Sequence, residues 1–118
     1  MKLIWTNRIA LNDEGVDRIK RVAGIYRLMH YDANRKKYLV HYVGQAKDLR
    51  DRLSKHLPTT EENRCCKEKL KNHHCYFRAA AITRQTDRDG AEVALYKRYR
   101  PSCPERLPDV NPIDINYI

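Results

Sequence analysis

Two stretches in the first half of the chain have the alternating pattern of β-strands with two different faces. In residues 23–31 the side chain of Tyr26 shares its face with every second residue, and in residues 37–44 the side chain of Tyr42 does the same. A short polar turn at residues 32–35 separates the two stretches. This pattern predicts an antiparallel β-hairpin.

Four further stretches are predicted to be helices, at residues 12–22, 46–57, 61–71 and 87–100. In the second, leucines recur every four residues and form the apolar stripe of a helix that faces a core, and Pro58 ends it. The third is predicted from a capping box in residues 59–62, which begins with threonine and ends with glutamate.

The remaining segments complete an α/β (α+β) fold. Residues 76–82 are predicted to be a third strand, and residues 102–118, which are rich in proline, an irregular C-terminal tail. We therefore expect a three-stranded, mainly antiparallel sheet flanked by helices. The chain is expected to be one domain over residues 1–118, with its core in about residues 22–101.

The chain is strongly basic. It has 24 Lys and Arg against 15 Asp and Glu, a formal net charge of +9. A small domain with this excess attracts polyanions, most commonly the phosphate backbone of a nucleic acid. A solubilising surface or a patch for anionic lipid would have the same composition, so charge alone favours nucleic acid only modestly.

The chain has no predicted targeting or membrane segment. Its first residues break their apolar run too early for a signal peptide, and no stretch approaches the roughly 20 apolar residues that span a bilayer. We therefore expect a cytoplasmic protein with no membrane partner. In that compartment its four cysteines are expected to be reduced thiols.

Three of the cysteines lie near two histidines, in the order Cys65, Cys66, His73, His74 and Cys75. Zinc prefers pairs spaced as C-x2-C or H-x3-H. Adjacent helical residues point about 100° apart, so Cys65 and Cys66 could not easily share one ion. One buried and one exposed thiol is the simpler interpretation, and whether the group binds a metal stays open.

The two strands of the hairpin each carry a tyrosine beside a glycine. Tyr26 follows Gly24 closely, and Tyr42 precedes Gly44. Antiparallel pairing could bring both rings to one face of the sheet. Tyrosines in such positions usually serve as core residues whose hydroxyl finds a partner at the rim.

Arg52 and His56 are four residues apart and therefore share a face of their predicted helix, at the edge of its leucine stripe. An arginine there could hold a phosphate through two hydrogen bonds. The alternative is a solvated basic face, because other basic residues lie nearby: Lys47, Arg50 and Lys55.

Glu92 stands at the start of an apolar pattern on the last predicted helix. A carboxylate on an apolar face is costly unless a cation or a strong donor compensates it. A metal ion is one solution and Arg52 is another. The alternative is that Glu92 lies in the first helical turn and complements the helix dipole.

These residues follow one another in a familiar order. Gly24-Ile25-Tyr26 and Tyr42-Val43-Gly44 resemble the two signature tripeptides of the GIY-YIG nuclease family, with Val43 in place of the usual isoleucine. Arg52, His56 and Glu92 match the arginine, histidine and glutamate of that family. The resemblance covers about residues 22–101, most of the chain.

The resemblance implies a metal-dependent endonuclease that hydrolyses phosphodiester bonds in DNA. Glu92 would bind Mg²⁺ or Mn²⁺, and Arg52 would hold the scissile phosphate. Tyr26 would be the general base, with Tyr42 supporting it or trading that role, and His56 would assist by hydrogen bonding or by accepting the tyrosine proton. Further contacts to nucleic acid are expected from Gly44, Lys47, Arg50 and Lys55.

Two positions depart from the usual pattern of the family. Gln45 stands where a lysine is common, and Pro104 stands where an asparagine is common. Asn111 could replace that asparagine if the tail folds back.

Two other functions compete with the nuclease. One is a non-catalytic nucleic-acid-binding domain on the same fold, and the other is an interaction domain for an acidic partner. The chain has no added DNA-recognition module, so it is expected to recognise backbone and shape, and a protein partner or dimerisation could supply further specificity. The sequence does not choose among repair, recombination, restriction and mobile-element roles, or between DNA and RNA.

Overall fold

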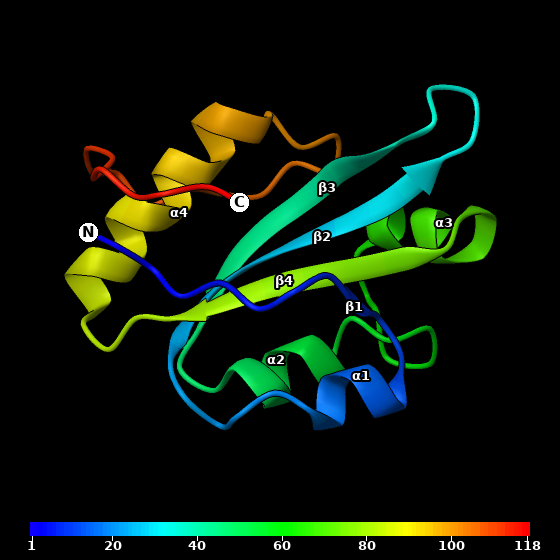
Figure 1. The fold of residues 1–118 in the computed structure, drawn as a ribbon, viewed down its shortest axis with the longest axis horizontal. Helices are drawn as coiled ribbons and strands as arrows, with labels where there is room; N and C mark the ends of the chain where they lie inside the picture. The colour runs from blue at the N-terminus through cyan, green and yellow to red at the C-terminus, as the bar shows by residue number, and fades with distance from the viewer.

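The computed structural model describes all residues 1–118, around a four-stranded antiparallel sheet (Figure 1). The strands lie in the order β1-β4-β2-β3. Their bounds are β1 (Ile9–Ala10), β2 (Gly24–Asp32), β3 (Lys37–Ala46) and β4 (Cys75–Ala81).

The predicted hairpin is formed by β2 and β3, joined by the turn after Asp32. Tyr26 pairs with Gly44 and Leu28 with Tyr42. The side chain of Asp32 accepts hydrogen bonds from two backbone N–H groups of the turn, which holds the chain reversal in place. The hairpin therefore sets the two signature tripeptides side by side.

The predicted number of strands is wrong, because the sheet has four strands rather than three. The additional strand, β1, is only two residues long and pairs Ile9 with Phe77 and Ala10 with Tyr76 on β4. A strand of two residues is too short to show an alternating pattern, so only the folded chain reveals it.

Four helices cover the sheet on both faces (Figure 1). Their bounds are α1 (Asp13–Asp17), α2 (Leu49–Ser54), α3 (Arg64–Asn72) and α4 (Gln85–Tyr99). α1 and α2 lie on one face and α4 lies on the other. None of these helices has the length and the apolar character that crossing a membrane requires.

Each face of the sheet buries a hydrophobic cluster of its own. The cluster under α1 and α2 includes Leu11, Val16, Tyr26, Leu28, Tyr42, Leu49, Leu53 and Phe77. The cluster under α4 includes Leu3, Trp5, Ile25, Val43, Ile82 and Leu95. Tyr26 and Ile25 thus face opposite sides of β2, as the alternating pattern predicts.

The first two helices are shorter than predicted. α1 ends at Asp17, and the Ile19 carbonyl beyond it accepts a hydrogen bond of 2.6 Å from Arg50 Nε. α2 ends at Ser54 rather than at residue 57, and a tighter turn follows in which His56 N–H donates to the Leu53 carbonyl. Apolar spacing continues through such turns, so it does not locate the end of a helix.

The predicted capping box at residues 59–62 does not form. α3 begins later, with Asn63 as its N-cap, whose side chain accepts a hydrogen bond of 3.1 Å from Cys66 N–H. Thr60 Oγ1 instead donates to the Ser54 carbonyl at 2.6 Å. Glu61 is buried before the helix begins, where its carboxylate pairs with His56.

The C-terminal tail forms no helix or strand, and it returns across the molecule to the other end of the chain. Leu3 N–H donates to Asn116 Oδ1 at 2.6 Å, and Asn116 Nδ2 donates back to the Leu3 carbonyl at 2.9 Å. Ile113 and Tyr117 pack against the cluster under α4. The tail therefore packs against the hydrophobic core.

A disulfide joins Cys65 on α3 to Cys103 in the tail, with their Cα atoms 5.5 Å apart. The prediction of four reduced thiols is wrong for this pair. The two cysteines are 38 positions apart in the sequence, and only the tertiary fold makes them neighbours. Cys66 and Cys75 remain free thiols.

Reduction of this disulfide should destabilise the protein. Opening a loop of 38 residues returns entropy to the unfolded chain equivalent to about 4 kcal/mol. Urea unfolding with and without reductant, and of a double variant with serine at both cysteines, should show this lower free energy of unfolding. Cys75→Ser is the control and should change little. Equal unfolding midpoints for oxidised and reduced protein would contradict the expectation.

Two buried histidines lie against each other beneath α3. His30 Nδ1 and His41 Nδ1 are 3.0 Å apart. Burial and the positive charge of Lys69 lower the pKa of His30 to about 4. Burial and the neighbouring His30 lower the pKa of His41 to about 3. Both side chains are therefore neutral in the folded protein at neutral pH.

Stability should fall in mild acid because of these two histidines. In the unfolded chain they bind protons near pH 6.5, while in the folded chain they resist protonation until about pH 4 or below. Their contribution is complete above pH 6.5 and is lost progressively as the pH falls toward 4 and below. Urea unfolding at several pH values should show a shallower decline for His41→Gln than for the exposed control His74→Gln.

Candidate active site

The hydroxyl of Tyr26 is the centre of a buried polar network. Tyr26 lies on β2, and its side chain is buried. Its ring crosses β3 at Gly44, where an added Cβ atom would stand 2.5 Å from the Tyr26 oxygen. Gly44 is therefore required for the close packing of this ring, because any side chain would displace the hydroxyl.

Arg52 and His56 both contact the Tyr26 hydroxyl. Arg52 Nε donates to the oxygen over 3.3 Å, and His56 Nε2 lies 2.8 Å from it. The expectation that these two side chains point the same way is confirmed, although His56 lies beyond the last residue of α2. The arginine sits in the helix and the histidine in the turn that follows it.

Tyr42 packs beside this network rather than joining it. Its ring is 6.2 Å from that of Tyr26 and 5.0 Å from that of His56, measured between centroids. Its hydroxyl makes no hydrogen bond in the structure. The fold brings both tyrosines to one face, as expected, but only the Tyr26 hydroxyl contacts Arg52 and His56.

The other side of His56 faces a carboxylate that the sequence did not single out. His56 Nδ1 makes a short hydrogen bond to Glu61 Oε2, and the second oxygen, Oε1, accepts from Asn63 N–H at 3.0 Å. A sequence pattern had placed Glu61 inside a capping box, and nothing in its spacing from His56 indicated this contact.

Glu92 is buried in the middle of α4, so it is not a first-turn residue that serves the helix dipole. Gln45 Nε2 donates to Glu92 Oε1 at 2.9 Å and to Asp89 Oδ1 at 2.7 Å. Burial raises the pKa of Glu92, the hydrogen bond from Gln45 lowers it, and the neighbouring Asp89 raises it further. The net effect is a raised pKa, because burial disfavours the ionised form of the carboxylate.

A cleft of about 330 Å³ joins these groups. Tyr26, Arg52 and Glu92 line it, so three of the five predicted catalytic residues share one cavity. Gly44, a predicted nucleic-acid contact, and Gln45 also line it. The wall opposite the sheet comes from the tail: Glu105, Arg106, Leu107 and Pro108. The irregular tail thus shapes the site, which its sequence did not indicate.

Glu105 is a second carboxylate in this cleft. Burial raises its pKa, although less of the side chain is hidden than in Glu92. It directly follows Pro104, the residue that stands where an asparagine is common in the resembled family. Carboxylate oxygens from Glu92 and Glu105 are the donors in this cleft that could hold a hard divalent cation.

The predicted nucleic-acid contacts differ in their surroundings. Lys47 and Lys55 are exposed, and Lys55 Nζ lies 3.3 Å from Asp51. Arg50 Nε donates a hydrogen bond to the Ile19 carbonyl, and Gly44 packs against the Tyr26 ring. The two lysines are therefore the residues of that set with free surface.

Asn111 does not reach the cleft. Its carbonyl lies against Gly90 on α4, where an added Cβ atom would be 3.3 Å from the oxygen. Gly90 and Glu92 are two residues apart and so point about 200° away from each other around the helix. The tail folds back, but it brings Glu105 rather than Asn111 to the cleft.

The cysteines and histidines of residues 65–75, whose metal binding the sequence left open, do not form one cluster of ligands. Cys65 is in the disulfide, and His73 packs on the ring of His30 with centroids 4.5 Å apart. The potential ligands that do meet are His56, Glu61 and Cys66, whose donor atoms all lie within 4.8 Å of one another. Two of the three are already joined by the hydrogen bond described above.

No protein-family model matches the chain, and no curated protein matches it in sequence. Solved structures of the GIY-YIG N-terminal endonuclease domain of UvrC from Thermotoga maritima do match. The magnesium-bound domain is 21% identical with a TM-score of 0.53, and an asparagine-to-alanine mutant bound to its catalytic divalent cation is 22% identical with a TM-score of 0.54. Each match covers 80% of this chain and 100% of that chain. This chain is therefore a domain with the GIY-YIG fold.

Proposed function

We propose that this chain is a metal-dependent endonuclease that hydrolyses phosphodiester bonds in DNA. The observation that carries the proposal is the Tyr26 hydroxyl, which contacts Arg52 and His56 and faces the same cleft as Glu92. The likeness to a domain described as an endonuclease bound to its catalytic divalent cation supports it. A domain that only bound nucleic acid would need no buried carboxylate in such a cleft.

The cleft fits a divalent cation. Glu92 Oε1 accepts from Gln45, while its second oxygen makes no hydrogen bond and is available as a ligand. One or two carboxylates suit Mg²⁺, which keeps several of its waters, and Mn²⁺ accepts the same oxygen donors. When bound, the cation would supply Lewis-acid stabilisation of charge at the phosphate.

Tyr26 would take a proton from the attacking water. Burial raises the pKa of Tyr26, and the positive charge of Arg52 opposes that effect without cancelling it. A free phenolate is therefore rare at neutral pH. As the water proton moves to the Tyr26 oxygen, the Tyr26 proton moves to His56 Nε2, which is 2.8 Å away.

Arg52 would hold the phosphate through its guanidinium NH₂ groups, because its Nε is directed at Tyr26. The water oxygen forms a bond to phosphorus while the bond from phosphorus to the leaving oxygen breaks. The leaving oxygen then takes a proton from solvent, and His56 returns its proton to solvent through Tyr26. Arg52 stabilises the charge that builds on the phosphoryl oxygens.

The excess of positive charge and the exposed Lys47 and Lys55 suit the phosphate backbone of a nucleic acid, and DNA is the proposed substrate. Such contacts reach the backbone and carry no sequence information. Specificity would come from the shape of the substrate or from a protein partner.

Cleavage of a supercoiled plasmid by the purified chain tests the proposal. We expect nicking with Mg²⁺ or Mn²⁺ and none with EDTA. Filter binding to DNA across a salt series runs in parallel. Salt-dependent binding without nicking of plasmid, branched or single-stranded DNA would replace the proposal with a non-catalytic nucleic-acid-binding domain. Absence of any DNA affinity would support an interaction domain for an acidic partner.

A further inference from the structure

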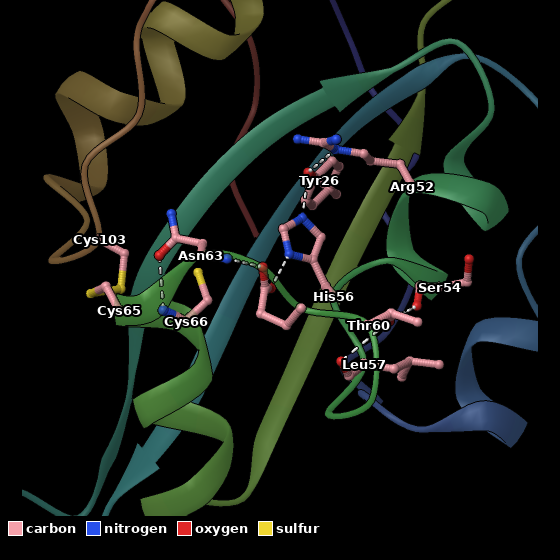
Figure 2. A network of polar contacts seen from close by, with 11 residues as sticks. Tyr26, Arg52, Ser54, His56, Leu57, Thr60, Asn63, Cys65, Cys66 and Cys103 are labelled. Carbon is pink, nitrogen blue, oxygen red and sulfur yellow. Dashed lines mark hydrogen bonds and ion pairs between the residues drawn. A yellow bond between two sulfur atoms is a disulfide. The ribbon is translucent and has the colours of Figure 1, made fainter.

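A continuous chain of hydrogen bonds runs from Arg52 through the Tyr26 hydroxyl and His56 to Glu61. Figure 2 shows the side chains of Tyr26, Arg52 and His56 pointing toward one another, with dashed lines along their contacts. The last link joins His56 Nδ1 to Glu61 Oε2. The side chains of His56 and Glu61 are 5% and 4% exposed, so water does not compete for this link.

The direction of each hydrogen bond follows from the chemistry of its members. Glu61 as a carboxylate can only accept, so the shared proton belongs to His56 Nδ1. A neutral imidazole carries one N–H, which leaves a lone pair on Nε2. The Tyr26 hydroxyl must then donate to Nε2 while it accepts from Arg52 Nε. Every donor along this chain meets an acceptor.

Glu61 is held in place by its other oxygen. Oε1 accepts from the Asn63 backbone N–H, and Asn63 is the N-cap that starts α3. Burial alone would raise the pKa of Glu61, but the hydrogen bonds from His56 and Asn63, with the charge of Arg52, lower it below its ordinary value. Glu61 is therefore an ionised acceptor fixed between a turn and a helix.

We propose that Glu61 is a positioning residue, which holds the His56 ring in the tautomer that accepts the Tyr26 proton. The inference rests on the proposed nuclease function, because only that reaction gives the Tyr26 proton a reason to move. Glu61 does not touch the substrate. It orients the ring and stabilises the imidazolium that forms when Nε2 takes the proton, the role a carboxylate plays behind a catalytic histidine in other enzymes.

Cys66 is a buried thiol close to His56 and Glu61, and the three side chains together could bind a metal ion. Burial raises the pKa of its thiol to about 12, so the sulfur is a neutral group at neutral pH. This buried sulfur lies beside the hydrogen bond between His56 and Glu61. Samples for the test therefore contain EDTA during purification and NMR, so that no adventitious metal sits between His56, Glu61 and Cys66.

The test begins with the tautomer of His56, read from long-range ¹H–¹⁵N NMR of the full chain labelled at histidine nitrogens. The wild type should carry its proton on Nδ1. In Glu61→Gln the amide oxygen should stay on Asn63 N–H, because that donor needs an acceptor. The amide NH₂ then faces His56 Nδ1 as a donor, which moves the ring proton to Nε2 and removes the acceptor for Tyr26.

The same variants are then compared in the nicking assay with Mg²⁺. Glu61→Gln should lower the rate at least about 100-fold, the scale of losing one general acid–base group. Glu62→Gln makes the same change of charge at the exposed neighbour and should leave rate and tautomer unchanged. Glu61→Asp keeps an ionised acceptor and should recover part of both. Urea unfolding checks that each variant is folded.

Two results would overturn the inference: a wild-type His56 protonated on Nε2, or a folded Glu61→Gln variant with wild-type tautomer and rate. A wild type that never cleaves DNA would defeat the proposed nuclease function instead. In that case the NMR measurement still decides whether Glu61 fixes the His56 tautomer, so the two failures are distinguishable.

Discussion

Replacing Glu92 with alanine or glutamine should lower the rate of Mg²⁺-dependent nicking by at least about 100-fold, the scale of losing one electrostatic stabiliser of a transition state. Glu92 is the buried carboxylate of the cleft with an oxygen free for a cation. Glutamine has nearly the same shape and can still accept the hydrogen bond from Gln45, so the loss would reflect charge rather than packing.

The fold should tolerate the Glu92 substitutions well. Burial raises the pKa of Glu92, so the folded protein bears a cost for its ionised form, which a neutral side chain removes. We expect the free energy of unfolding to be unchanged or higher for Glu92→Gln. Mg²⁺ binding measured by calorimetry should weaken together with the nicking rate.

Asp89→Asn is the matched control for Glu92. Asp89 also accepts from Gln45 Nε2, at 2.7 Å, but it does not line the cleft. We expect most of the nicking rate and of the Mg²⁺ affinity to remain. A Glu92→Gln protein that is folded and cleaves like the wild type would sink the metal assignment.

Replacing Arg52 with alanine should also lower the rate by at least about 100-fold. The guanidinium makes two contributions that alanine cannot replace. It would bind the phosphate, and its charge opposes the rise that burial causes in the pKa of Tyr26. In Arg52→Ala the Tyr26 hydroxyl also loses its donor over 3.3 Å, so water activation and charge stabilisation should fail together.

Two variants separate these contributions from general charge. Arg52→Lys keeps one positive charge without the planar fork and should recover only part of the rate. Lys55→Ala removes an exposed charge one turn away, which pairs with Asp51 at the surface. It should weaken DNA binding and reduce its salt dependence, with a much smaller effect on turnover. Equal losses in Arg52→Ala and Lys55→Ala would mean that Arg52 serves binding alone.

The central elements of the fold were predictable because their cause is local. Tyr26 and Tyr42 occupy the same face of a hairpin because side chains alternate along a strand and a polar turn reverses the chain. Glu92 was singled out because a carboxylate inside an apolar helical pattern conflicts with its surroundings. Each of these depends on residues that are close in the sequence.

Other parts of the site depend on contacts between residues far from one another in the chain. The disulfide partners Cys65 and Cys103 lie 38 positions apart. Glu105, which lines the cleft, follows Cys103, whose N–H donates to the His41 carbonyl on β3 and so holds this part of the tail beside the sheet. The short strand β1 exists because β4 offers it an edge to pair with. No local sequence pattern predicts contacts between residues that are so far apart in the chain.

Glu61 shows where local sequence patterns stop being sufficient and tertiary contacts decide the structure. The sequence by itself determined the hairpin, the final helix and the order of Tyr26, Tyr42, Arg52, His56 and Glu92 along the chain. A local rule also predicted a capping box at residues 59–62 with a helix that begins at Glu61, and such a cap is worth about 1 kcal/mol at the surface. The tertiary structure decided otherwise, because a buried histidine needs a partner and an unpaired polar group in the core costs more than a lost cap.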